Sequence, residues 1–112
     1  MTTRHVLPDR RFGYTVNLEY GGQRAVFSVT VGYFTDTGEP AEVFISGAKA
    51  GSDVEGIARD GAVLLSLALQ YNVPLATIAH AITREQNGKP QSIIGKVVDL
   101  LQKPSEPREK EK

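Results

Sequence analysis

The sequence contains no cysteine, no tryptophan, a single methionine and no excess charge of either sign. Without cysteine the chain can form no disulfide, no thiolate metal site and no thiol redox pair. Thirteen basic and thirteen acidic residues cancel to a formal net charge of zero, so no global field draws the chain onto nucleic acid or an anionic membrane. A local basic patch stays open as an alternative.

Long apolar runs are also missing. No stretch nears the roughly 18 apolar residues of a membrane span, and residues 1–9 lack the apolar run of a signal peptide. We therefore expect a cytoplasmic protein with no membrane partner. The length of 112 residues suits one domain. We expect a flexible leader over residues 1–11, the domain over 12–102 and a disordered charged tail over 103–112.

The first half of this domain has the period of β-strands. Residues 14–20 alternate between apolar and polar, and residues 25–33 do the same after a Gly21-Gly22 pair that suits a tight hairpin. A turn at Asp36-Thr37-Gly38 precedes a third strand over residues 42–45, and Pro40 is expected at an edge. Consecutive strands joined in this way predict an antiparallel β-meander.

The second half has the period of helices. Ser52 and Glu55 form a capping box, so a long helix should begin at Ser52 and stop at Asn72-Val73-Pro74, because proline disfavours helical geometry before it. The residues expected on its core-facing stripe are Val54, Ile57, Ala58, Gly61, Leu64, Leu65 and Ala68. The residues expected on its solvent side are Glu55, Arg59, Asp60 and Ser66.

Two shorter helices should follow. The first has the apolar stripe Leu75, Ile78, Ala79 and Ile82 and is followed by the break Asn87-Gly88. The second is expected over residues 92–101, with a stripe wide enough to be buried on two sides or to serve a partner. The predicted fold class is α+β: a three-stranded antiparallel β-meander followed by two or three helices packed on one face.

The turn over residues 47–52 is the best candidate site. Its glycines and the helix N-terminus expose backbone N–H donors that favour an anion such as a phosphate. Lys49 adds a positive charge. The candidate ligand-binding residues are therefore Gly47, Lys49, Gly51 and Ser52. The alternative is a connector whose glycines only permit the bend.

A second candidate is a basic and aromatic surface. Arg10 and Arg11 precede Tyr14, and Arg24 lies across the predicted hairpin, so together they would stack on and neutralise a nucleotide or a single strand. The alternative places Tyr14 on the core-facing side of its strand. His80 has no second histidine or cysteine at ligand spacing and is expected at or near a helix surface. We assign no metal site and no catalytic residue.

Three segments taken in order resemble a known family. They read Glu42-Val43-Phe44-Ile45, Lys49-Ala50-Gly51-Ser52 and Leu64-Leu65-Ser66-Leu67-Ala68-Leu69-Gln70-Tyr71-Asn72-Val73-Pro74-Leu75. Their order and spacing are similar to those of the TSCPD domain, the small C-terminal module of adenosylcobalamin-dependent (class II) ribonucleotide reductases, which also occurs as short stand-alone proteins. The resemblance covers roughly residues 14–101.

The chain departs from the family before the last helix. Where the family typically carries the motif Thr-Ser-Cys-Pro-Asp, this chain reads Asn87-Gly88-Lys89-Pro90-Gln91-Ser92, without cysteine. The full reductase also needs a large barrel with redox-active cysteines and a cobalamin site, which this chain cannot house. Adenosylcobalamin would be held only by a partner reductase.

The resemblance thus implies a non-catalytic accessory or regulatory domain in deoxyribonucleotide metabolism, which binds a nucleotide or a protein partner such as the reductase large subunit. Two alternatives stay open. One is a nucleic-acid-binding module that uses Arg10, Arg11 and Arg24, and the other is a subunit of a split reductase. A homo-oligomer is compatible with each of them.

Overall fold

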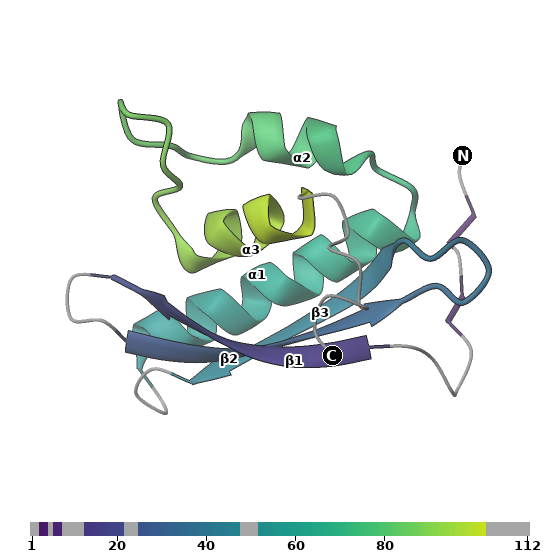
Figure 1. The fold of residues 1–112 in the computed structure, drawn as a ribbon, viewed down its shortest axis with the longest axis horizontal. Coiled ribbons are helices and arrows are strands. Elements are labelled where there is room, and N and C mark those ends of the chain that lie inside the picture. The colour runs from purple at the N-terminus through teal and green to yellow at the C-terminus, as the bar shows by residue number, and fades with distance from the viewer. Residues whose placement is uncertain (1–2, 5, 8–12, 22–24, 48–51, 103–112) are drawn as a thin grey trace, which may run out of the picture.

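A computed structural model describes residues 3–4, 6–7, 13–21, 25–47 and 52–102 of the chain. Three strands form one sheet, and three helices lie on a single face of it, with α1 next to the sheet and α2 farthest from it (Figure 1). The predicted α+β class and the order of its elements are therefore confirmed.

The sheet is the predicted meander. Strands β1 (Gly13–Tyr20), β2 (Ala25–Tyr33) and β3 (Pro40–Gly47) pair antiparallel in the order β1-β2-β3. Val29 of β2 lies opposite both Val16 and Ile45, so alternate residues of all three strands share the core face. The third strand is longer than the predicted 42–45. It begins at Pro40 and forms an edge of the sheet, where proline is tolerated.

Helix α1 (Asp53–Gln70) begins as the sequence predicts. The Ser52 hydroxyl accepts the N–H of Glu55 at 3.2 Å, which satisfies one of the backbone donors that a helix start leaves unpaired. The helix ends at Gln70 because Asn72 adopts a left-handed conformation (φ 68°) and turns the chain away before Pro74 is reached.

The face of α1 that packs on the sheet differs from the predicted stripe. Val54, Ile57 and Leu64 were expected in the core and are exposed. The side chains that are buried instead are those of Ala58, Ala62, Leu65, Leu69 and Gln70. Since α1 carries apolar residues around most of its circumference, periodicity alone cannot select a face. The small side chains of Ala58 and Ala62 allow the close approach to the sheet.

Helices α2 (Leu75–Ala81) and α3 (Ile93–Gln102) complete the core. Figure 1 shows α3 lying between α1 and α2, and its residues Val97 and Val98 are fully buried. The wide apolar stripe of α3 is thus buried on two sides within the chain, one of the two predicted uses. No helix in the described ranges has the length and apolar character that crossing a membrane requires.

Candidate functional site

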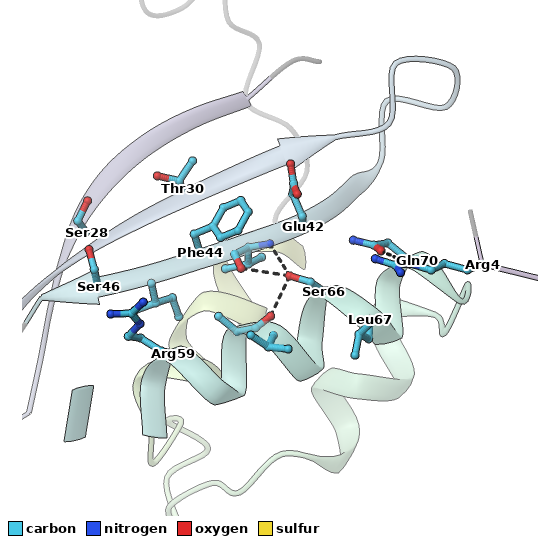
Figure 2. Close-up of a pocket in the computed structure, with 14 residues that line it drawn as sticks. Arg4, Ser28, Thr30, Glu42, Phe44, Ser46, Arg59, Ser66, Leu67 and Gln70 are labelled. Atoms are coloured by element: carbon cyan, nitrogen blue, oxygen red, sulfur yellow. Dashed lines mark hydrogen bonds between the residues drawn. The ribbon is translucent and has the colours of Figure 1, made fainter. Parts of the chain in front are cut away.

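A groove of about 570 Å³ runs along the free edge of β3, between this strand and α1 (Figure 2). Its walls come from the outer face of the sheet, from α1 and from Arg4. The lining residues are Arg4, Ser28, Thr30, Glu42, Val43, Phe44, Ile45, Ser46, Arg59, Ala62, Val63, Ser66, Leu67 and Gln70.

In the middle of the groove, side chains of α1 form hydrogen bonds with the backbone groups at the edge of β3. The Ser66 hydroxyl accepts the N–H of Val43 at 2.8 Å and lies 3.1 Å from the Val43 carbonyl oxygen. One turn further along α1, the amide of Gln70 donates to the carbonyl oxygen of Ala41 at 3.0 Å. Ser66 was expected to face solvent, and that prediction is wrong, because an edge strand against a helix needs partners for its backbone groups.

One end of the groove is held by Arg4 and Glu42. The Arg4 Nε donates to the Gln70 side-chain oxygen at 2.7 Å, which holds Arg4 against α1. Glu42 is buried although it lies on the outer face of the sheet. Its carboxylate lies over Gly32, where an added Cβ would stand 2.6 Å from the carboxylate oxygen Oε2. A glycine opposite Glu42 therefore makes room for this buried acid.

The other end of the groove carries an exposed aromatic ring and a cation. Phe44 projects from the outer face of β3, opposite Thr30, and Ser46 lies opposite Ser28 on the same face. Arg59 extends from α1 toward the part of β3 that carries Ser46 (Figure 2). Within the described part of the chain, its guanidinium makes no hydrogen bond and no ion pair.

Gly47 and Ser52 are the described residues of the predicted anion-binding turn, and Gly47 directly follows Ser46 of the groove. Gly47 closes β3 with φ +117°, and an added Cβ would stand 2.7 Å from the Val26 carbonyl oxygen, so a glycine is required there. Ser52 caps α1, and the acidic residues Asp53 and Glu55 already occupy the first turn. These carboxylates complement the positive end of the helix and compete with an external anion.

The other predicted site residues lie outside the described ranges. They are Lys49 and Gly51 of the turn and Arg10, Arg11 and Arg24 of the basic surface. The anion site and the basic surface therefore stay predictions. Tyr14 is partly buried against the core and packs edge to face with Tyr33, with 6.0 Å between the two ring centroids. This agrees with its core-facing interpretation.

A second pocket, of about 660 Å³, lies between β1, α3 and the loop before α3. The Tyr20 hydroxyl donates to the Pro90 carbonyl oxygen at 2.7 Å, and the Lys96 ammonium donates to the Glu19 carbonyl oxygen at 2.5 Å. Burial raises the pKa of Tyr20, and the nearby Glu85 raises this pKa further. The Tyr20 hydroxyl and the Lys96 ammonium are already hydrogen-bonded within the protein. This pocket is therefore the weaker candidate for a ligand-binding site.

The loop between α2 and α3 is held by hydrogen bonds among its own residues and to the start of α3. Arg84 pairs with Pro90 in an isolated antiparallel bridge, and Ser92 accepts the N–H of Gly95 at the start of α3. Across the described ranges, no group of three or more histidine, cysteine or acidic side chains is arranged to hold a metal. His80 is exposed on α2, as its surface interpretation predicts.

None of the groove residues was singled out as a site residue from the sequence. Four of them define the groove's chemistry: Phe44, Arg59, Ser66 and Gln70. Only Phe44 carries a signal that could have been used, since it occupies an outward-facing position of β3 where the alternation calls for a polar residue. The other three depend on how α1 is rotated against β3, which the sequence pattern does not define.

Comparison with known proteins decides the family. The TSCPD domain model matches residues 1–103. The chain belongs to the TSCPD domain family. No solved structure matches it significantly.

Relatives of this TSCPD domain include three proteins called vitamin B12-dependent ribonucleotide reductase. The chain is 39% identical over 83 residues to that of Bradyrhizobium diazoefficiens, covering 74% of this chain and 6% of the reductase. The identity to the Rhodopirellula baltica protein is 39% over 77 residues, which cover 69% of this chain and 7% of the reductase. The identity to the Agrobacterium fabrum protein is 38% over 80 residues, which cover 71% of this chain and 6% of the reductase. The chain thus spans only a small part of the reductases that it matches, and it is related to one region of them.

Proposed function

We propose that this TSCPD domain is a non-catalytic accessory domain that docks on a large protein partner, a B12-dependent ribonucleotide reductase, in cytoplasmic deoxyribonucleotide metabolism. The observation that carries the proposal is an uncovered apolar face on α1. The relatives support the choice of partner, because in them the matching sequence is 6–7% of one much longer chain.

The α1 apolar face consists of Val54, Ile57, Leu64 and Tyr71. Ile57 is 69% exposed and Leu64 is 67% exposed. Ile57, Leu64 and Tyr71 recur every second turn, so they lie along one side of the helix. Single exposed apolar residues are ordinary on protein surfaces, whereas a continuous row of large ones marks an interaction site. This spacing suits insertion of α1 into an apolar groove of a partner.

Acidic residues flank this face. Asp60 lies beside Ile57 and Leu64 on the helix surface, and Asp53 lies at its N-terminal end. A partner with basic residues around an apolar groove would complement this arrangement, which favours correct encounter more than it adds affinity.

The non-catalytic part of the proposal rests on the residues available. The chain has no cysteine, so thiol redox chemistry would come from the partner, whose relatives are named as vitamin B12-dependent. The accessory domain would then act by binding alone.

The docking proposal is tested with the purified chain and the B12-dependent reductase of the same organism. We expect the two proteins to co-elute in size-exclusion chromatography and to bind in calorimetry. Ile57→Lys and Leu64→Lys should each weaken binding by about tenfold or more, because each places a charge in the dry centre of the interface. The matched control is Val26→Lys, at a residue that is 49% exposed on the outer face of the sheet.

Equal weakening by Val26→Lys and Leu64→Lys would exclude the α1 apolar face as the docking surface. Absence of any complex with wild-type protein would exclude docking on this reductase. Ribonucleotide reduction, assayed with and without the chain, separates the accessory role from a subunit of a split reductase. Reduction that depends strictly on the chain would contradict the non-catalytic role.

A further inference from the structure

The ring of Phe44 is the most unusual feature of the outer sheet face. It is 57% exposed, at a strand position where its neighbours on the same face, Glu42 and Ser46, are polar. Thr30 lies directly opposite it, and Ser28 lies opposite Ser46. An exposed aromatic ring framed by hydroxyl groups is a platform for stacking a flat aromatic ligand, which removes apolar area from water on both partners.

Arg59 supplies a cation at the same end of the groove. It lines the groove together with Phe44 and Ser46, and its guanidinium is without an ion pair or hydrogen bond among the described residues. A guanidinium binds a phosphate through two parallel hydrogen bonds, which makes arginine well suited to phosphate recognition. The Ser46 hydroxyl, on the β3 wall of the groove, is a further donor at the same end.

The spacing of these groups fits one ligand class. Phe44 and Ser46 are two residues apart on one face of β3, which separates them by roughly 7 Å along the strand. A ribose bridges a similar span between a base and its 5′-phosphate. We infer that this end of the groove binds a nucleoside phosphate, with the base stacked on Phe44 and the phosphate held by Arg59 and Ser46.

The edge of β3 argues against an extended peptide as the ligand. Strand addition needs free backbone groups along an edge, but Val43 and Ala41 are already bonded to Ser66 and Gln70. A peptide could therefore not pair along the centre of this edge. The groove also favours an anion over a cation at this end, because its carboxylate, that of Glu42, lies at the other end over Gly32.

This site is separate from the docking surface. Arg59 lies on the side of α1 that faces β3, away from Ile57 and Leu64. It also differs from the predicted turn site, since neither Gly47 nor Ser52 supplies a group to it. Failure of one proposal therefore leaves the other standing.

The test is an NMR titration of the full chain with backbone amide and arginine side-chain signals recorded. The ligands are a nucleoside triphosphate, the same nucleoside without phosphate, inorganic phosphate and a short single-stranded DNA. We expect the triphosphate at millimolar concentration to shift Phe44, Ser46 and the Arg59 side chain. Tighter binding of the DNA at the same residues would identify nucleic acid as the source of the nucleoside phosphate, and equal or weaker binding would identify the free nucleotide.

Variants separate the two contacts. Arg59→Gln should weaken binding about tenfold, through loss of the charged hydrogen bonds. Phe44→Ala should also weaken it about tenfold, through loss of stacking, and Phe44→Tyr should retain binding. The matched controls are Lys96→Gln, a cation at the other pocket, and Val26→Ala, an exposed apolar residue on the outer face of the sheet. Both controls should bind like wild type.

Three results would overturn the inference. The first is no shift in the groove with any phosphate-bearing ligand, and the second is equal binding of the nucleoside without its phosphate. The third is a set of shifts confined to Ser52–Glu55 amides, which would place the anion at the turn and the helix N-terminus.

Discussion

The hydroxyl of Ser66 on α1 completes the backbone hydrogen bonding of Val43 on β3. It accepts the Val43 N–H at 2.8 Å and lies within donating distance of both the Val43 carbonyl, at 3.1 Å, and the Ala62 carbonyl, at 2.8 Å. One side chain thus connects a helix to the free edge of a sheet and occupies groups that could otherwise pair with another chain.

Ser66→Ala should destabilise the domain by about 1–2 kcal/mol, because the Val43 N–H loses its partner in a partly buried place. Urea unfolding followed by circular dichroism measures the change. The matched control is Ser46→Ala, at an exposed serine of β3, which should leave the free energy of unfolding within about 0.5 kcal/mol of wild type. If both variants unfold at the same urea concentration, the cap on Val43 contributes nothing to stability.

Two glycines of α1 should respond in opposite directions to alanine. An added Cβ at Gly56 meets nothing within 4 Å, whereas one at Gly61 would stand 2.6 Å from Cγ1 of Ile94. Gly56→Ala should therefore stabilise the domain by about 0.5–1 kcal/mol through helix propensity. Gly61→Ala should destabilise it, since overpacking costs about 1–3 kcal/mol.

Thermal unfolding of both variants, and of Gly61→Ala in an Ile94→Ala background, measures these effects. The Gly61→Ala penalty should shrink when Ile94 is truncated, because the clash is with that side chain. A Gly61→Ala variant that is as stable as Gly56→Ala would show that α3 moves away without cost.

The ion pair between Arg84 and Asp99 fixes the loop before α3 to the helix itself. Arg84 donates two parallel hydrogen bonds to the carboxylate, at 2.8 and 3.0 Å, and also bonds the carbonyls of Ala79 and Gly88. The hydrogen bonds that Arg84 donates to Asp99 raise the pKa of Arg84, so the guanidinium stays charged at all physiological pH values. The stabilisation linked to the Arg84 guanidinium is fully present below the ordinary arginine pKa and is lost as pH rises through the raised folded-state pKa.

Asp99→Asn should loosen this loop more than it destabilises the whole domain, because both side chains are about one third exposed, at 28% and 35%. Hydrogen exchange should accelerate several-fold at the Glu85 and Gly88 amides and little in β2. Arg84→Lys should have the same effect, since lysine lacks the planar fork. Uniform acceleration in loop and sheet would contradict this local role. Asp60→Asn, at an exposed acid on α1, is the control.

The order of strands and helices could be predicted from the sequence because each depends on local patterns. Alternation in residues 14–20, the capping box at Ser52 and the break before Pro74 are signals within one segment. Chain order then defines an antiparallel meander, because short turns leave few other arrangements.

The rotation of α1 could not be predicted in this way. Both the buried side with Leu65 and the exposed side with Leu64 are apolar, so the hydrophobic pattern has two solutions. The choice depends on contacts with distant segments: Ser66 and Gln70 satisfy β3, and Gly61 admits Ile94 of α3. In a sequence, polar side chains that bond to a strand edge cannot be told from those that face solvent. The position of Arg59 beside Phe44 in the groove depends on the same rotation of α1.

Tyr20 should make the stability of the domain sensitive to alkaline pH. Its pKa is raised above the ordinary 10.0, first by burial and then by Glu85, so folding favours the neutral phenol. The resulting stabilisation is fully present below the ordinary value and is lost as pH rises through the folded pKa.

In an ultraviolet titration, wild type should show a tyrosine transition above 10.0 that Tyr20→Phe lacks. Glu85→Gln should move this transition down toward the ordinary value. In urea unfolding, Tyr20→Phe should lose about 1 kcal/mol at neutral pH, with the Pro90 hydrogen bond, and should then decline less than wild type in alkali. An identical alkaline decline in both proteins would assign the pH dependence to other groups.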